Sequence, residues 1–172
     1  SLGHNIFSPK SISSYPQDAR DRPWAAFLYA SAGLNTVTKN HTDNAEITVG
    51  VVGPLALGRP VQSFVHKYLS RSPEPRGWGN QLENELGLML SWERSWPSKP
   101  YNARAFGWTA SAIPHIGATL GNIYTYGNAG LSFRLAPRAD VWQDDPVRVR
   151  PSIPGTGSFL NPDDAFSWYF FG

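Results

Sequence analysis

The stretch Tyr101–Pro137 reads YNARAFGWTASAIPHIGATLGNIYTYGNAGLSFRLAP. Apolar and polar residues alternate in two runs on either side of a short turn at Thr119–Asn122, a pattern typical of a β-hairpin. Successive side chains of a strand point to opposite faces, so each run has one apolar and one polar face. The stretch therefore predicts two long antiparallel strands joined by a tight turn.

A histidine lies on the polar face of this predicted hairpin. In the first run His115 has the same parity as Ser111, and in the returning run Tyr124 and Tyr126 belong to the polar parity. We expect these four side chains to share one surface. An imidazole among hydroxyl groups could perform chemistry there, or it could only form structural hydrogen bonds to the two tyrosines.

Other segments of the chain repeat the alternation. We predict further strands in four segments and the start of a last one: Leu2–Phe7, Pro23–Leu34, Ala45–Val52, Gln81–Trp96 and Ala165–Phe171. The segment Gln81–Trp96 is far longer than the usual strand of ~5–6 residues. Its apolar face holds Leu82, Leu86, Leu88, Leu90 and Trp92, and its polar face includes Glu83, Glu85 and Glu93. We interpret the glutamates as the polar lining of an interior.

One segment has helical periodicity instead. Apolar residues recur at i, i+3, i+4 and i+8 within Arg59–Ser70, which predicts a short amphipathic helix. The helix could lie at a membrane surface, with Arg59, Lys67 and Arg71 near phosphate head groups, or pack against the end of a sheet. We interpret His66, at the border of its polar side, as a solvated or packing residue. Polar and proline-rich segments predict connections at Lys10–Asp21, Thr38–Asn44, Arg71–Gly79 and Arg138–Asp164.

Composition excludes several classes of protein. The 172 residues suffice for one domain, and the absence of cysteine excludes disulfides and thiolate metal sites. A net charge of +2 does not favour a nucleic-acid partner. Charged residues make up only 16% of the chain, below the ~25% of typical soluble domains. No apolar run reaches the ~18 residues of a transmembrane helix.

Long strands with one apolar and one polar face occur in two settings. In a soluble β domain the apolar face turns inward, whereas in an outer-membrane barrel it faces lipid and the polar face lines the interior. Aromatic residues gather near the predicted strand ends, at Trp92, Trp96 and Trp108 among others, as in the aromatic girdles of barrels. The pattern favours a membrane barrel, and a soluble β domain is the alternative.

Several blocks of the chain, taken in order, resemble a known family. They are GHNIFSP (Gly3–Pro9), DRPWAAFLYASAGL (Asp21–Leu34), VGP (Val52–Pro54), RPVQSFVHK (Arg59–Lys67), RGWGNQLENELGLMLSWERSW (Arg76–Trp96) and PHIGATLGNIYTYGNAGLSFRL (Pro114–Leu135). The series is similar to the outer-membrane lipid A deacylases, barrels that remove the 3′-linked acyloxyacyl chain of lipid A. The resemblance implies that residues 1–172 form an all-β, antiparallel, partial outer-membrane β-barrel domain. About 7–8 of about 12 strands and one short amphipathic helix are expected.

The resemblance also implies a site and a partner. His115 matches the catalytic histidine, a general base that activates water, and Ser111, Tyr124 and Tyr126 would contact the substrate. Histidine suits this role because its unperturbed pKa of ~6.5 allows it to accept a proton near neutral pH. The family uses calcium. No Asp or Glu lies between His115 and Arg138, so this stretch has no carboxylate to bind the ion, and its ligands remain unknown.

The expected partners are lipid A or lipopolysaccharide and the lipid of the bacterial outer membrane. Asn122, Asn128 or an inward glutamate could bind the calcium, together with an Asn-Asp pair that precedes the first block in the family. Two other functions remain open. One is a non-catalytic barrel, acting as a pore or structural protein, and the other is a soluble carbohydrate-binding domain.

Overall fold

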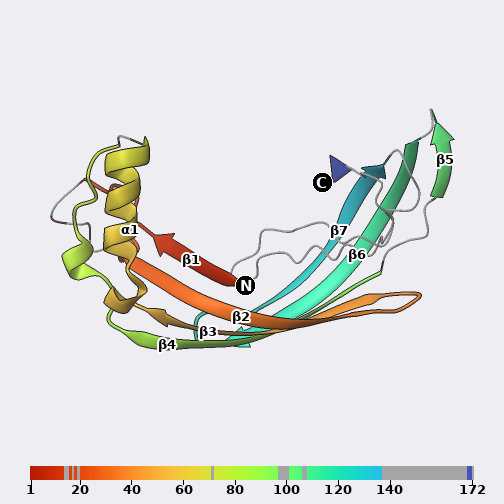
Figure 1. The fold of residues 1–172 in the computed structure, drawn as a ribbon, viewed down its shortest axis with the longest axis horizontal. Helices are drawn as coiled ribbons and strands as arrows, with labels where there is room; N and C mark the ends of the chain where they lie inside the picture. The colour runs from red at the N-terminus through yellow and green to blue at the C-terminus, as the bar shows by residue number, and fades with distance from the viewer. Residues whose placement is uncertain are drawn as a thin grey trace. The chain divides into compact units, whose positions relative to one another are not determined.

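The structure is a computed structural model that describes residues 1–13, 16, 18, 20–70, 72–96, 101–105, 108–136 and 170–171. Eight strands in these residues form one sheet in the order β1-β2-β3-β4-β6-β7-β8, and β5 pairs with β6 (Figure 1). The strands are β1 (Leu2–Phe7), β2 (Ala25–Val37), β3 (Thr42–Val52), β4 (Glu85–Ser95), β5 (Tyr101–Ala105), β6 (Trp108–Gly121), β7 (Tyr126–Ala136) and β8 (Phe170–Phe171).

Residue contacts divide the chain into two compact units. The first comprises Ser1–Ala32 and Thr48–Met89, and the second comprises Gly33–Ile47 and Leu90–Gly172. Strands β2, β3 and β4 pass from one unit into the other.

The first unit has an apolar core between its strands and the connection that follows β3. Trp24, Ala26, Ala56 and Trp78 are at most 3% exposed, and the rings of Trp24 and Trp78 lie 4.9 Å apart. Four further apolar residues pack against them: Ile6, Ile12, Leu28 and Val51. The connection contains two short 3-10 helices, η1 (Pro54–Ala56) and η3 (Trp78–Asn80), which bring Ala56 and Trp78 onto the strands.

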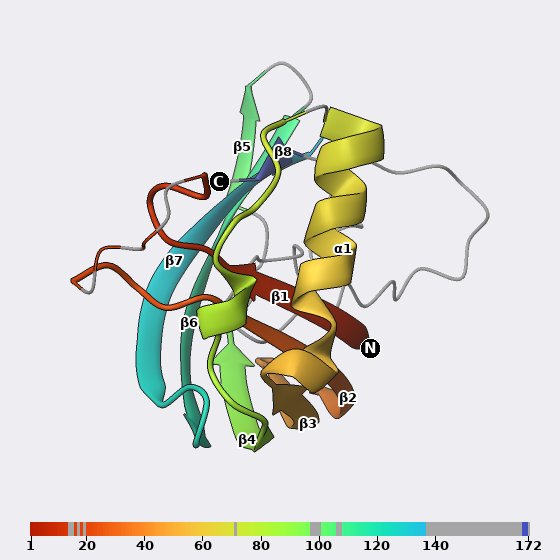
Figure 2. The same cartoon turned by 90° about the vertical axis from the view of Figure 1, so that its left-hand side faces the viewer.

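The predicted helix is present in the same connection. The α-helix α1 (Gly58–Phe64) continues into the π-helical turns η2 (Val65–Ser70), so that residues 58–70 form one helical segment. It begins directly on the core, because a Cβ atom at Gly58 would lie only 2.5 Å from the Ala26 Cβ. From there α1 rises across the direction of β2 (Figures 1 and 2). Its apolar residues Phe64 and Leu69 are 57% and 70% exposed.

The described residues therefore leave Phe64 and Leu69 uncovered, while the start of the helix packs on the core through Gly58. Among the described residues, no helix has both the length and the apolar character needed to cross a membrane.

The second unit contains the predicted hairpin. Strands β6 and β7 pair in antiparallel register from Thr109↔Ala136 to Thr119↔Tyr126. The turn predicted at Thr119–Asn122 was placed too early, since β6 extends to Gly121 and the connection is formed by residues 122–125. The Thr125 side chain causes this shift, because its hydroxyl donates to the Gly121 carbonyl at 2.8 Å and closes the turn.

Burial alternates along the strands with the polar side chains covered and the apolar ones exposed. On β4, Leu90 is 61% exposed while its neighbour Ser91 is 3% exposed. On β3, Ile47 is exposed and Glu46 and Thr48 are buried. A soluble domain would bury the apolar face, so this arrangement confirms the predicted orientation of the two faces.

Two other boundaries differ from the prediction. Strand β4 begins at Glu85 instead of Gln81, because the residues before it bond to other segments. Leu82 N–H donates to the Trp24 carbonyl, and the Asn84 side chain accepts from Leu55 N–H. Strand β3 begins at Thr42, inside the predicted turn Thr38–Asn44. The predicted connection Arg138–Asp164 and the segment 165–169 lie outside the described residues, and Phe170–Phe171 forms β8.

Candidate functional site

The structure places His115 on the covered face of β6. It pairs with Gly130 of β7, and its ring lies against that residue: a Cβ at Gly130 would be 2.7 Å from the ring atoms Cε1 and Nε2. The absence of a side chain at residue 130 therefore provides the space for the imidazole. On the β4 side of β6, two hydrogen bonds fit the same antiparallel register: Ser91 Oγ to Thr119 Oγ1, and Trp96 N–H to the Pro114 carbonyl. This register places Ser95 of β4 beside His115.

Two other predicted site residues, Ser111 and Tyr126, share this face but do not surround His115. Ser111 is four residues before His115 on β6. Tyr126 pairs with Thr119, which is four residues after His115 on the same strand. At ~3.3 Å per residue, Ser111 and Tyr126 lie ~13 Å from His115, in opposite directions. Tyr124 belongs to the connection before β7 and not to the strand. Ser111 and Tyr126 thus lie on the same face of the sheet as His115, whereas a compact His115 site is not formed by these four side chains.

Next to His115 on the covered face, a carboxylate is held by an amide. The Asn128 Nδ2 atom donates to Glu93 Oε2 at 2.9 Å, and Glu93 is 5% exposed. This bond passes over Gly117, where a Cβ would lie 2.6 Å from Asn128 Oδ1 and 2.8 Å from the Trp92 carbonyl oxygen. The Ser91 and Thr119 hydroxyls form another buried hydrogen bond of 2.9 Å between β4 and β6. Paired polar groups thus connect three strands.

Replacing Gly117 by valine should destabilise this part of the sheet, because the new side chain would displace Asn128 and press on the β4 backbone. We expect a loss of ~1–3 kcal/mol in the free energy of unfolding, measured by urea titration in lipid vesicles. Gly127→Val is the matched control, since a Cβ at Gly127 has only the Gly117 carbonyl oxygen within reach, at 3.9 Å. Equal losses in the two variants would contradict the assigned role of Gly117.

Calcium requires several oxygen ligands, and its fit to this chain can be tested. Within the described residues, no group of three or more His, Cys, Asp or Glu side chains could hold a metal ion. Glu93 is bonded to Asn128, while Glu83 and Glu85 are exposed at and before the start of β4. Of the three glutamates predicted to line an interior, Glu93 is thus covered, whereas Glu83 and Glu85 have the same parity but are exposed. The calcium ligands therefore stay a prediction from the resemblance, with no cluster of three or more such side chains among the described residues.

A second polar group lies on the helical segment of the first unit. The carbonyl oxygen of Pro73 is 2.8 Å from His66 Nδ1. Because a carbonyl oxygen can only accept, Nδ1 carries the proton and Nε2 of the neutral ring is left as an acceptor. One helical turn earlier, Gln62 donates to Ser8 Oγ and accepts from Trp78 Nε1, both at 2.9 Å. The half-buried His66 thus has a fixed ring next to a fixed amide.

The sequence predicts His66 to be a solvated or packing residue, and its hydrogen bond to Pro73 is compatible with that interpretation. The spacing of Gln62 and His66, i and i+4, places both side chains on one face of the helix and could have indicated a shared surface. The contact with Pro73 could not be inferred, since it depends on where the backbone of residue 73 lies relative to the helix. The exposed apolar side chains of Phe64, Val65 and Leu69 lie on the same helical segment.

The outward apolar face, the covered polar face and the antiparallel pairing define the class of this protein as an outer-membrane β-barrel protein. The family model described as outer membrane protein LpxR matches residues 1–172. The chain therefore belongs to the outer membrane protein LpxR family and is located in the outer membrane, which confirms the resemblance found in its sequence.

A solved structure agrees with this assignment at the level of the fold. LpxR from Salmonella typhimurium is similar with a TM-score of 0.77 and 22% sequence identity, and the match covers 99% of this chain and 56% of that chain. The chain thus spans a little over half of the length of that protein. No curated protein matches the chain.

Proposed function

We propose that this protein hydrolyses the 3′-linked acyloxyacyl ester of lipid A in the outer membrane, with a histidine as general base. The family assignment supports an outer-membrane protein, and the resemblance of the sequence blocks to lipid A deacylases supports the substrate. The observation that carries the chemistry is His66, whose Nδ1 is bonded to the Pro73 carbonyl and whose Nε2 can accept a proton.

Two histidines are candidates for the base. His115 is the candidate that the sequence resemblance implies, but it lies on the covered polar face, away from the exposed apolar surface. His66 lies on a segment whose Phe64 and Leu69 side chains are exposed. The ester carbonyl of a lipid lies at the end of its acyl chains, so a base beside an exposed apolar surface is better placed to reach it. This argument favours His66.

The proposed reaction is an ester hydrolysis. His66 Nε2 removes a proton from water as the oxygen attacks the acyl carbonyl, and the protonated ring then returns the proton to the departing sugar oxygen. The bond between the acyl carbon and the sugar oxygen breaks, and the products are a fatty acid and a lipid A alcohol. Gln62, held by Ser8 and Trp78, is one turn away and can orient the water or the substrate.

The resemblance also suggests that the reaction depends on calcium. When bound, a calcium ion would stabilise negative charge on the ester oxygen. If the proposal is right, chelation with EDTA should stop the release of fatty acid and added calcium should restore it. Unchanged release in EDTA would remove calcium from the proposed function.

The proposed function is tested by mass spectrometry of lipid A from cells that express the gene. We expect a new lipid A species that lacks the mass of the 3′-linked acyloxyacyl chain and is absent from cells with the empty vector. An identical lipid A profile in both cultures, with the protein present in the outer membrane, would instead support the non-catalytic barrel.

A further inference from the structure

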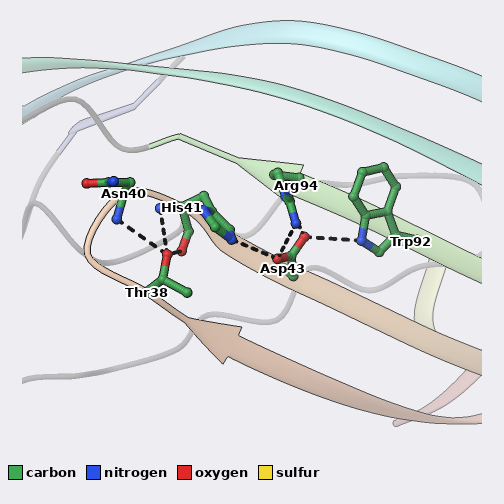
Figure 3. Close-up of polar contacts among 6 residues, drawn as sticks. All are labelled: Thr38, Asn40, His41, Asp43, Trp92 and Arg94. Atoms are coloured by element: carbon green, nitrogen blue, oxygen red, sulfur yellow. Dashed lines mark hydrogen bonds and ion pairs between the residues drawn. The ribbon is translucent and has the colours of Figure 1, made fainter.

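A cluster of polar side chains lies at the start of β3 and the end of β4, within the second unit (Figure 3). The Asp43 carboxylate accepts from Arg94 Nε at 2.8 Å and Nη2 at 2.9 Å, and from Trp92 Nε1 at 3.1 Å. His41 Nε2 lies 3.1 Å from the same carboxylate. We call these four residues the Asp43 cluster. Each carboxylate oxygen has two partners, so the cluster holds the β2–β3 turn, β3 and β4 together.

The Asp43 cluster stands where the outward surface changes from apolar to charged. On β4, Leu90 and Trp92 precede Arg94 on the same face and are 61% and 40% exposed. On β3, Ala45 and Ile47 follow Asp43 on the same face and are exposed. The apolar rows of both strands therefore end at one ion pair, and the exposed turn residue Asn40 lies beyond it.

The position of a charge on the lipid-facing side of a barrel is restricted. Its cost is greatest at the middle of the bilayer and fades near the interfaces, where tryptophan is enriched. The Arg94 guanidinium lies 5.6 Å from the centre of the Trp92 ring, and Asp43 balances its charge. A paired cation over an aromatic ring suits the layer between hydrocarbon and water.

We propose that the Asp43 cluster lies among the lipid head groups of the outer membrane and sets the depth of β3 and β4 in the bilayer. Ala45 is then just inside the hydrocarbon, Leu90 is deeper, and Asn40 is in water. The alternative is an ion pair that joins the two strands without contacting lipid head groups, and the two cases place the same residues at different depths.

The absence of cysteine from this chain allows single cysteines to report depth. Asn40→Cys, Ala45→Cys and Leu90→Cys variants are labelled with bimane after folding into phosphatidylcholine vesicles. Quenching is measured with spin labels on the lipid head group, with spin labels in the middle of the acyl chain, and with aqueous iodide.

At Ala45 we expect head-group quenching to exceed mid-chain quenching about twofold or more, with the reverse at Leu90 and iodide dominant at Asn40. Strongest quenching at Ala45 by the mid-chain label, or by iodide alone, would overturn the proposal.

A second measurement asks whether the cluster sets the depth. The double variant Asp43→Leu, Arg94→Leu extends the apolar rows, so the label at Asn40 should gain head-group quenching about twofold and lose access to iodide. The control replaces Asp18 and Arg20 by leucine, an exposed ion pair of 3.3 Å outside the strands. An unchanged quenching profile in the Asp43→Leu, Arg94→Leu variant would overturn the depth-setting role. If that variant does not fold, the quenching of the three single-cysteine variants still tests the proposed depth.

Discussion

Replacing His66 by alanine is expected to lower release of the 3′-linked acyl chain by ~10²–10⁴-fold, the usual contribution of a positioned general base. The reason is local: the Pro73 carbonyl holds Nδ1 and leaves Nε2 for the proton of water. Release is measured as the fraction of lipid A that lacks the chain, by mass spectrometry, at matched amounts of protein in the outer membrane.

His66→Asn and His115→Ala are the informative companions to this variant. Asparagine can still donate a hydrogen bond toward Pro73 but cannot act as the base, so it should be as inactive as alanine while keeping the local structure. His115→Ala should keep most of the activity, because His115 lies on the covered polar face. If His115→Ala abolishes release and His66→Ala does not, the assignment of the base to His66 is wrong and the resemblance-based one is right.

Replacing Gly58 by valine is expected to lower the free energy of unfolding by ~1–3 kcal/mol and to reduce deacylation as well. A Cβ at Gly58 would lie 2.5 Å from both the Ala26 Cβ and the Trp78 ring, which are part of the core. Since α1 begins at this contact, the added side chain should lift the start of the helix and move Gln62 and His66. Stability is measured by urea titration in lipid vesicles, and activity by the lipid A assay.

Gly79→Val provides the matched control for Gly58→Val. Gly79 lies in η3 of the same unit, and a Cβ there would meet no atom within 4 Å. Its effect should stay within ~0.5 kcal/mol, as for other open positions. Comparable losses in both variants would indicate that the close contact of α1 with the core is not what the substitution disturbs.

Much of the fold could be predicted from alternation alone. The strands around Leu2–Phe7, Ala45–Val52 and in the hairpin of Tyr101–Pro137 were recognised because side-chain period is a local property of the backbone. The helix after Pro60 was recognised for the same reason. The ends of the elements were predicted less well. Strand β4 stops short of Leu82 because Trp24, distant in the sequence, accepts the hydrogen bond of that residue.

The candidate site was predicted less well than the fold. A surface shared by His115, Ser111 and Tyr126 follows from parity. The distance of Tyr126 from His115 depends on the register of β6 and β7, which parity does not specify. The Asp43 cluster joins residues about fifty positions apart, and no local pattern connects them.

The amino-acid sequence by itself determined that this protein is an antiparallel all-β chain with one apolar and one polar face per strand, and to which family it belongs. These properties depend on residue order over short distances. Only the tertiary structure decided that Phe64 and Leu69 of the helical segment 58–70 are exposed and that Pro73 orients His66. Each of these depends on which distant backbone and side-chain groups meet once the chain is folded, and therefore on contacts that local periodicity does not contain.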